Sequence, residues 1–418
     1  MTKPFSARAE LILPLDYAMA SVASRFAEET GQVWGMEKGQ QIKIAMAVEE
    51  LFLFLASDAR EGESAKLICE NGGYYMQVTG VFPVRSLPAA LFNITAKVHQ
   101  DDEESLSQLG LLLAARAVDR LEMVKTAASL ELRLIMEREY PPGAGEDRLL
   151  PAGTYKIKNG AAAQDWKQLA QRIHGSYGLK APGFTQFPGK VADMIASGDY
   201  DAVAVADSQG NVAGGVIWKK AGKMAEMYGP YVFCDQPGLI AELLDASLAK
   251  MGRSQAVCVV NRAPVETMPP GYFENLGSDL YRQLAEDQGA LSYVHPCLNE
   301  FVTAHYQRLV LPRHIQTVQL AGEKLPLHSA LSAEVDWRLG QAKLSILVAG
   351  ANLAENLTNH VAFLKAHGVV QITFHLDLAL YNDALFGQEI MAADFEPQIL
   401  LPWGGTGDVV VFAHREDH

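Results

Sequence analysis

The sequence has few of the features that mark a secreted, metal-binding or membrane-spanning protein. It contains four cysteines, none in a C-x-x-C pair, and no histidine cluster at metal-site spacing. A disulfide framework and a zinc site are therefore not expected, and the cysteines are predicted to be reduced thiols of a cytoplasmic protein. No apolar run approaches the roughly 20 residues that span a bilayer. Acidic and polar residues interrupt the apolar N-terminal segment, so no signal peptide is expected.

Basic charge is also scarce. Lys and Arg together number 35 against 49 Asp and Glu, which gives a net charge of -14. Such a chain repels the phosphates of nucleic acids and anionic lipids, so neither nucleic-acid nor membrane binding is expected. Apolar residues make up 49% and charged residues 20% of the 418 residues, as in folded globular proteins. A chain of this length is expected to form two or three domains.

The hydrophobic periodicity predicts a multidomain α+β protein in three parts. A Pro- and Gly-rich segment, residues 140–145, is the clearest linker and separates the first part from the second. The third part repeats the element order of the second part's later half, which suggests a partial internal repeat. The expected parts are residues 1–140, 150–312 and 313–418.

The helix predicted for IKIAMAVEELFLFLA, residues 42–56, carries the first candidate site. The N-terminal part resembles histidine-kinase-like ATPases of the anti-sigma-factor serine kinase type, and this segment is similar to their Glu/Asn helix. The resemblance implies an α/β sandwich in which Glu50 acts as base or water positioner. An Asn one turn later would bind magnesium through oxygen. This chain has Phe54 there, and we expect its ring to pack with Leu51 and Leu55.

Two further positions complete the implied ATP site. The family's adenine-binding Asp-Gly motif corresponds to Thr79-Gly80, which has no carboxylate. Of the glycines that wrap the phosphates at a helix start, only Gly110 has a counterpart, so the cradle of N–H groups is reduced. One interpretation is an ATP site built from Glu50, Thr79 and Gly110. We favour a retained scaffold without nucleotide or metal, since fold and site separate easily.

Residues 150–280 resemble the GCN-five-related N-acetyltransferases, or GNAT fold. The segment DAVAVADSQGNVAGGVIW is similar to the family's central hairpin. The resemblance implies that backbone groups of the next strand, including those of Val232, pair with the pantetheine arm of acetyl-CoA. It also implies that a glycine turn opening a helix holds the pyrophosphate. Gly238 matches the first glycine, but Asp235 replaces a basic or Gln residue and Ile240 replaces the second glycine.

The segment VCVVNRAPVETMPPGYFENLG supplies the remaining candidates. Asn261 matches the family's strand Asn, and a helix is predicted near PGYFENLG. A Tyr in that helix often acts as general acid toward the coenzyme. Phe273 stands at its position, with Tyr272 one place early. An acetyl-CoA enzyme using Tyr272, with Glu226 as base, is one interpretation, and a GNAT scaffold without coenzyme is the one that we favour.

Other features have simpler interpretations. The run Gly404-Gly405-Thr406-Gly407-Asp408 is able to cradle an anion, but a hairpin turn explains it more simply. The acidic cluster at residues 101–104 is expected to be a solvated loop. No recognisable Ser or Cys nucleophile motif lies beside the histidines, so we expect surface or core roles for His174, His295, His305 and His314.

These observations together predict a cytoplasmic regulatory protein similar to bacterial signalling proteins, in which both enzyme-like domains are degenerate. It is expected to act by binding a protein partner or a small ligand. ATP and acetyl-CoA are the cofactors that the resemblances imply. The alternatives are an active acetyltransferase with a regulatory N-terminal domain, and a serine kinase of the anti-sigma-factor type.

Overall fold

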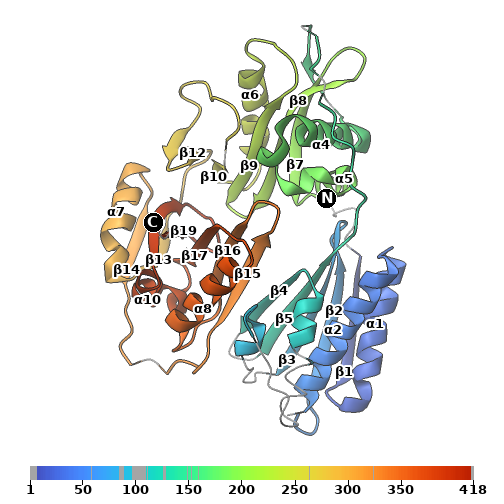
Figure 1. Ribbon diagram of the computed structural model, residues 1–418, viewed down its shortest axis with the longest axis vertical. Helices are drawn as coiled ribbons and strands as arrows, with labels where there is room; N and C mark the ends of the chain where they lie inside the picture. Colours follow the sequence, from blue (N-terminus) through green and yellow to red (C-terminus); the bar gives the residue numbers. More distant parts are fainter. Residues whose placement is uncertain are drawn as a thin grey trace. The chain divides into compact units, whose positions relative to one another are not determined.

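The computed structural model describes residues 7–57, 59–83, 89–96, 110, 112–125, 129–147, 149–151, 153–158, 160–262, 264–322 and 324–415. These residues form a mixed α+β protein with several sheets, as the sequence predicts (Figure 1). Contacts divide the chain into two compact units. Unit 1 contains residues 1–139, 324–334 and 344–368, and unit 2 contains residues 140–323, 335–343 and 369–418. Residues 313–418, expected to form a third part, contribute to both units.

Unit 1 is built on an antiparallel sheet of strand order β1-β2-β3-β5-β4. Strands β2 and β3 pair across Gly72-Gly73 as predicted, and Gly73 takes a φ of 86° that favours glycine. The strands are β1 (Arg8–Pro14), β2 (Ser64–Asn71), β3 (Tyr75–Pro83), β4 (Arg120–Lys125) and β5 (Ser129–Glu137). The helices are η1 (Tyr17–Met19), α1 (Ala20–Val33), α2 (Lys38–Ala56) and η2 (Ala89–Phe92).

Helices α1 and α2 cover one face of this sheet (Figure 1). The core lies between them, where Met76, Val78 and Phe82 of β3 pack with the buried face of α2. Successive strand residues point to opposite faces of a sheet. The side chain of Thr79 is therefore turned away from the helices, and its hydroxyl accepts a hydrogen bond from Gln77 at 3.1 Å.

The apolar spacing of LSQLGLLLAARAVDRL predicts a helix over residues 106–121, but in the structure this helix ends before residue 121. Helical residues are 110 and 112–117, and the chain then enters β4. The sequence RLEMVK alternates in polarity, and Leu121 and Met123 pack against the core, so tertiary packing favours a strand here. Residues 101–109, which include the acidic cluster, lie outside the described residues.

Buried amide side chains join the 324–334 segment to the N-terminal part of unit 1. The Asn93 Nδ2 donates to the Ser329 carbonyl at 3.0 Å, and its Oδ1 accepts from the Leu331 N–H at 2.8 Å. Asn356 Nδ2 donates to the same Oδ1 at 3.1 Å. Because each of these polar groups is buried, the network is needed to satisfy them.

Unit 2 contains a sheet of strand order β11-β12-β10-β9-β8-β7-β6, in which only β9 and β10 run parallel. Its strands are β6 (Lys156–Ile157), β7 (Tyr200–Ala206), β8 (Val212–Ala221), β9 (Met224–Val232), β10 (Cys258–Asn261), β11 (Glu274–Leu276) and β12 (Asp279–Gln283). Its helices are α4 (Ala163–Tyr177), η3 (Gly178–Lys180), η4 (Gly183–Gln186), α5 (Pro188–Ser197) and α6 (Leu239–Met251).

Two adjacent glycines of β8 bring helices close to both faces of this sheet. A Cβ at Gly214 would meet Leu243 of α6 at 3.2 Å, and a Cβ at Gly215 would meet Leu169 of α4 at 2.8 Å. Neighbouring strand residues face opposite ways, so α4 and α6 lie on opposite faces. The glycine pair thus lets both helices pack closely against β8, beside the end of β9.

The helix predicted near PGYFENLG is absent from these described residues, and that prediction was wrong. A turn leads instead into β11, which pairs with β12. Pro269 and Pro270 disfavour a helix because proline lacks an N–H and restricts the residue before it. Gly271 and Gly277 take φ values of 84° and 64°, which break a helix at either end.

The C-terminal region adds two further sheets. Strands β13 and β14 pair in parallel, and a five-stranded sheet has the order β15-β16-β17-β19-β18. The run at residues 404–408 joins β18 to its antiparallel neighbour β19, as the hairpin interpretation predicts. The elements are β13 (Ala290–Val294), η5 (Pro296–Leu298), α7 (Asn299–Arg308), β14 (Arg313–Thr317), β15 (Ala330–Asp336), β16 (Gln341–Val348), α8 (Leu353–Ala366), β17 (Gln371–Asp377), α9 (Tyr381–Ala384), α10 (Gly387–Ala392), β18 (Phe395–Leu401) and β19 (Val409–His414).

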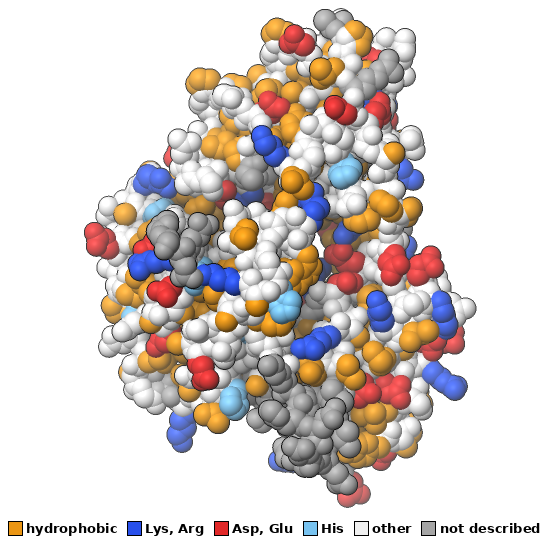
Figure 2. Space-filling model, viewed as in Figure 1, with side chains coloured by type: hydrophobic (Ala, Val, Ile, Leu, Met, Phe, Trp, Pro, Cys, Tyr) orange, Lys and Arg blue, Asp and Glu red, His pale blue; other side chains and the backbone are white. Residues whose placement is uncertain are grey.

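None of the described helices has the length and apolar character that a membrane crossing requires. Basic side chains are interspersed among acidic ones on the face drawn in Figure 2. Acidic and basic side chains are thus mixed on this face, although acidic residues outnumber basic ones in the sequence.

Candidate functional site

Two predicted residues of the N-terminal part meet in unit 1. A Cβ at Gly110 would lie 2.0 Å from Oε2 of Glu50, so the carboxylate is held against the backbone of this glycine. Burial, and then the neighbouring charge of Glu49, raise the pKa of Glu50. The resemblance implies that phosphates bind at Gly110. A carboxylate in the same place repels them and occupies their space.

The position of the implied magnesium ligand is apolar in the structure. Phe54 packs against the core that contains Leu51 and Leu55, as the sequence predicts. An aromatic ring offers no oxygen to magnesium. Among the described residues, no group of three or more His, Cys, Asp and Glu side chains is arranged to hold a metal ion.

Thr79, which stands at the position of the implied adenine contact, does not lie beside Glu50 and Gly110. Thr79 is 6% exposed and lies on the sheet face opposite α2, so Glu50 and Thr79 do not face one another. On the helix-covered face, a Cβ at Gly80 would meet the ring of Phe82 at 2.4 Å. The space beside the strand glycine is therefore filled by a phenyl ring.

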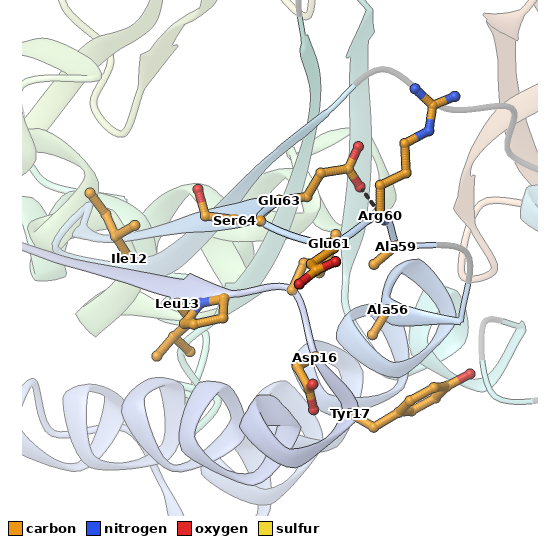
Figure 3. Close-up of a pocket in the computed structure, with 13 residues that line it drawn as sticks. Ile12, Leu13, Asp16, Tyr17, Ala56, Ala59, Arg60, Glu61, Glu63 and Ser64 are labelled. Carbon is orange, nitrogen blue, oxygen red and sulfur yellow. Dashed lines mark hydrogen bonds between the residues drawn. The ribbon is translucent and has the colours of Figure 1, made fainter.

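A separate cavity of about 560 Å³ lies at the junction of β1, η1 and the end of α2 (Figure 3). Two of its carboxylates bind backbone groups: Asp16 accepts from the Ala18 N–H at 2.8 Å, and Glu63 accepts from the Arg60 N–H at 2.9 Å. None of the predicted ATP-site residues lines it. The cavity thus lies apart from the predicted site.

The strongest interaction at the predicted coenzyme site was not foreseen. The parallel pairing of β9 with β10 ends at Met227 and Asn261, so the last residues of β9 extend beyond β10. There, the Val232 N–H donates to the hydroxyl oxygen of Tyr177 at 3.0 Å, and this hydroxyl lies 3.2 Å from the Val232 carbonyl oxygen. A side chain of α4 thus accepts the Val232 N–H and lies against the Val232 carbonyl, the two backbone groups assigned to pantetheine.

Tyr177 is fixed in this position by a carboxylate and by neighbouring rings. Its hydroxyl donates to Oε1 of Glu266 at 2.6 Å, and its ring packs edge-on against Tyr231 at 5.0 Å between centroids. Burial, and then Glu266, raise the pKa of Tyr177, so the phenol stays protonated at neutral pH. Tyr177 ends a helix far from β9 in sequence, and no local motif signals the contact.

Asn261 also turns its side chain toward the chain itself. Its Nδ2 donates to the carbonyl of Gly229 at 2.6 Å, which bridges the two strands where they separate. Its Oδ1 is buried and has no hydrogen-bond partner among the described residues. An amide oxygen left in this way retains the capacity to accept one hydrogen bond from a ligand or water.

The start of α6 remains open. Gly238 precedes the helix with a φ of 85°, and a Cβ there would meet nothing within 4 Å. Asp235 is exposed and Ile240 packs against the core, so neither fills the turn. Oε1 of Gln236 is buried without a hydrogen-bond partner among the described residues. This turn therefore keeps room for a ligand.

The predicted acid and base are engaged elsewhere. The Tyr272 hydroxyl donates to Oδ1 of Asp245 in the middle of α6 at 2.7 Å, and this hydrogen bond raises the pKa of Tyr272. Burial, and then Glu226, raise the pKa of Tyr228 on the same strand as Glu226. Tyr272 and Glu226 therefore each have a protein partner.

The glycine-rich turn between β18 and β19 also holds an internal anion. Asp377 accepts from the N–H groups of Thr406 at 2.6 Å, Gly407 at 3.1 Å and Ala379 at 2.9 Å. A Cβ at Gly405 would lie 2.5 Å from Oδ2 of the same carboxylate. The turn is thus an anion cradle, and its occupant is a side chain of β17.

Comparison with models of known protein families gives no match to this sequence. Comparison with curated proteins also gives none.

Proposed function

We propose that this chain is a regulatory protein that acts by binding a protein partner or a small ligand, and that its ATPase-like and GNAT-like sites transfer neither phosphate nor acetyl groups. In this proposal the N-terminal part is a degenerate histidine-kinase-like ATPase domain, and residues 150–312 form a degenerate GNAT-like domain. A second GNAT-like half follows in residues 313–418. The protein belongs to the kind of signalling pathway that uses anti-sigma-factor regulators in bacteria.

The observation that carries this proposal is the contact between Tyr177 and Val232. Pantetheine would need the Val232 N–H and carbonyl, and both are already within hydrogen-bond distance of the Tyr177 hydroxyl. A coenzyme would have to displace this hydroxyl, and Tyr177 and Glu266 would then need new hydrogen-bond partners. The contact therefore competes with coenzyme binding.

A second place follows the same pattern. At Gly110 the carboxylate of Glu50 stands against the backbone that would receive phosphates. Phe54 offers no metal ligand one turn further along α2. Both arrangements support the loss of ATP chemistry, and they argue against the serine kinase alternative.

A second candidate function is an acetyltransferase in which Tyr177 moves aside. Two buried amide oxygens, Gln236 Oε1 and Asn261 Oδ1, have no partner among the described residues, and the turn at Gly238 is open. The pantetheine arm carries amide N–H groups able to donate to such oxygens. This observation favours a coenzyme-like ligand over an empty scaffold.

Thermal unfolding of the whole protein with magnesium-ATP and with acetyl-CoA separates these functions. A ligand at about 100 times its Kd stabilises the folded state by about 2.7 kcal/mol, which raises the Tm of a domain by several degrees. We expect no rise with either ligand. A rise with acetyl-CoA that is lost in Gly238→Trp would contradict the proposal and support the acetyltransferase. A rise with magnesium-ATP that is lost in Glu50→Ala would support the kinase.

The positive side of the proposal is tested by direct binding. Proteins retained from the native host by the immobilised chain are purified and titrated against it by calorimetry. A stoichiometric complex is expected. If no purified candidate binds, while an acetyl acceptor is modified in the presence of acetyl-CoA, the regulatory proposal is abandoned.

A further inference from the structure

A cysteine and a histidine of unit 2 are in contact outside both predicted sites. Nδ1 of His295 lies 3.0 Å from Sγ of Cys297. The same Nδ1 accepts from the Cys297 N–H at 3.3 Å, so the side chain also caps η5. A ring nitrogen that accepts a backbone N–H carries no proton, and the proton of the neutral ring therefore resides on Nε2. The unprotonated Nδ1 thus lies within reach of the thiol proton of Cys297.

Cys297 is the accessible thiol of the chain. It is exposed, whereas Cys69, Cys234 and Cys258 are buried. Cys297 and His295 line a cavity of about 690 Å³, which also contains Gln319, Gln388 and Glu389. A reacting molecule therefore has room beside the sulfur, with amide groups on the cavity wall.

The third titratable group of this cavity is Glu389 on α10. Its Oε2 is buried and has no hydrogen-bond partner among the described residues. Its negative charge favours the protonated form of His295. A carboxylate in this position stabilises an imidazolium ion as it forms, which is the requirement for a general base.

We propose that Cys297 is a nucleophile that accepts an acyl group from thioesters, with His295 as its general base and Glu389 as a positioning residue. The sulfur attacks the thioester carbonyl while the thiol proton passes to Nδ1 of His295. The bond between the carbonyl carbon and the leaving sulfur then breaks, and the imidazolium returns its proton to the leaving thiolate. One thioester is exchanged for another, and no oxidant or reductant is needed.

The resting state of the pair favours acyl transfer over oxidation by peroxide. Burial raises the pKa of the Cys297 thiol and lowers the pKa of His295, so both groups are neutral near pH 7. Peroxide-sensing cysteines are thiolates before they react. A neutral thiol beside a neutral imidazole is activated only when an electrophile arrives, as in acyl transfer.

The first test incubates the whole protein with S-phenyl thioacetate. Intact-mass measurement and peptide mapping then give the rate and the position of acetylation. We expect one acetyl group, on Cys297, and none in Cys297→Ser. Acetylation of the wild-type protein at any other cysteine, or no acetylation, would overturn the proposal.

The second test separates base catalysis from simple exposure. His295→Asn keeps a capping acceptor for η5 but cannot take a proton at neutral pH. We expect the acetylation rate at pH 7 to fall by at least about tenfold, since general bases contribute roughly 10²–10⁴-fold. Alkylation by iodoacetamide at about pH 9 should remain close to that of the wild type, which shows that the thiol is still accessible.

The pH profile provides a readout that a structural role would not change. In His295→Asn the rate should rise about tenfold per pH unit between about pH 6 and pH 8, because only the thiolate reacts. In the wild type the acetylation rate should rise less steeply with pH, because the neutral imidazole accepts the thiol proton during the reaction. Glu389→Gln should lower the wild-type rate several-fold. Identical pH profiles for the wild type and His295→Asn would overturn the role of His295.

Discussion

The hydroxyl oxygen of Tyr177 lies 3.0 Å from the amide nitrogen and 3.2 Å from the carbonyl oxygen of Val232. The hydroxyl of a residue at the end of α4 thereby accepts the N–H of a β9 residue that lies beyond the end of β10. Backbone groups at such a separation of strands need a partner, because a buried unpaired group is costly. The chain supplies this partner itself at the place where the resemblance implies a coenzyme.

Replacing Tyr177 with Phe should destabilise unit 2. The change leaves the Val232 N–H and the Glu266 carboxylate without the hydroxyl, so the free energy of unfolding should fall by about 1–3 kcal/mol. Urea unfolding of the full chain, followed by tryptophan fluorescence, measures the change. Tyr272→Phe is the matched control, since its hydroxyl bonds an exposed carboxylate and its loss should cost less. Equal losses of unfolding free energy in the two variants would show that the contact with Val232 adds no stability beyond that of an exposed tyrosine–carboxylate hydrogen bond.

Gly110→Ala should have opposite effects in two backgrounds. In the wild type the new methyl group would meet Oε2 of Glu50 at 2.0 Å, so the carboxylate must rotate and stability should fall. In Glu50→Ala the methyl group has room, and the change should stabilise helical residue 110 by about 0.5–1 kcal/mol. Thermal unfolding of the four proteins in this double-mutant cycle gives the coupling. A coupling free energy near zero would mean that the Glu50 carboxylate does not lie against Gly110.

Asn93→Ala should loosen the 324–334 segment of unit 1. The change removes the acceptor of the buried Leu331 N–H and the donor to the Ser329 carbonyl. Unpaired buried groups cost about 1–3 kcal/mol each, so hydrogen exchange of the Leu331 amide should accelerate at least about tenfold. Gln32→Ala changes an exposed amide of α1 in the same unit and is the control. An unchanged exchange rate at Leu331 would contradict this account of the network.

Asp383 should make the stability of the protein fall as the pH rises toward neutrality. Burial, and then the charge of Asp377, raise its pKa to about 7. An Asp in an unfolded chain has a pKa of about 3.9. Between these values the folded state holds a proton that the unfolded state has lost, so unfolding becomes easier as the pH rises, by at most about 1.4 kcal/mol per pH unit.

Comparison with Asp383→Asn isolates this effect. The free energy of unfolding of the wild type, relative to that of the variant, should fall between about pH 4 and pH 7 and stay level above. Urea titrations across this range measure the difference. Asp394→Asn removes an exposed carboxylate of the same unit and controls for lost charge. A difference between wild type and Asp383→Asn that does not vary with pH would contradict the raised pKa.

Most helices and strands could be predicted from the sequence because their signals are local. The alternation of AELILPL and the helical spacing of residues 39–57 each depend on neighbours within a few positions, and the structure has β1 and α2 there. The helix predicted at PGYFENLG failed where proline and glycine chemistry outweighed a family resemblance. The predicted helix over residues 106–121 included the first two residues of β4, because packing against the sheet of unit 1, which favours a strand, is not visible locally.

The residues of the candidate sites divide in the same way. The sequence alone determined which ligands were missing, since Phe54 has no oxygen and Thr79 has no charge wherever they lie. Only the tertiary structure decided what stands in their place: Glu50 against Gly110, Tyr177 against Val232, and Glu389 beside the neighbouring pair formed by His295 and Cys297. Except for that pair, the partners are far apart in the chain. Their contacts depend on how helices pack on sheets, which no pattern of neighbouring residues records.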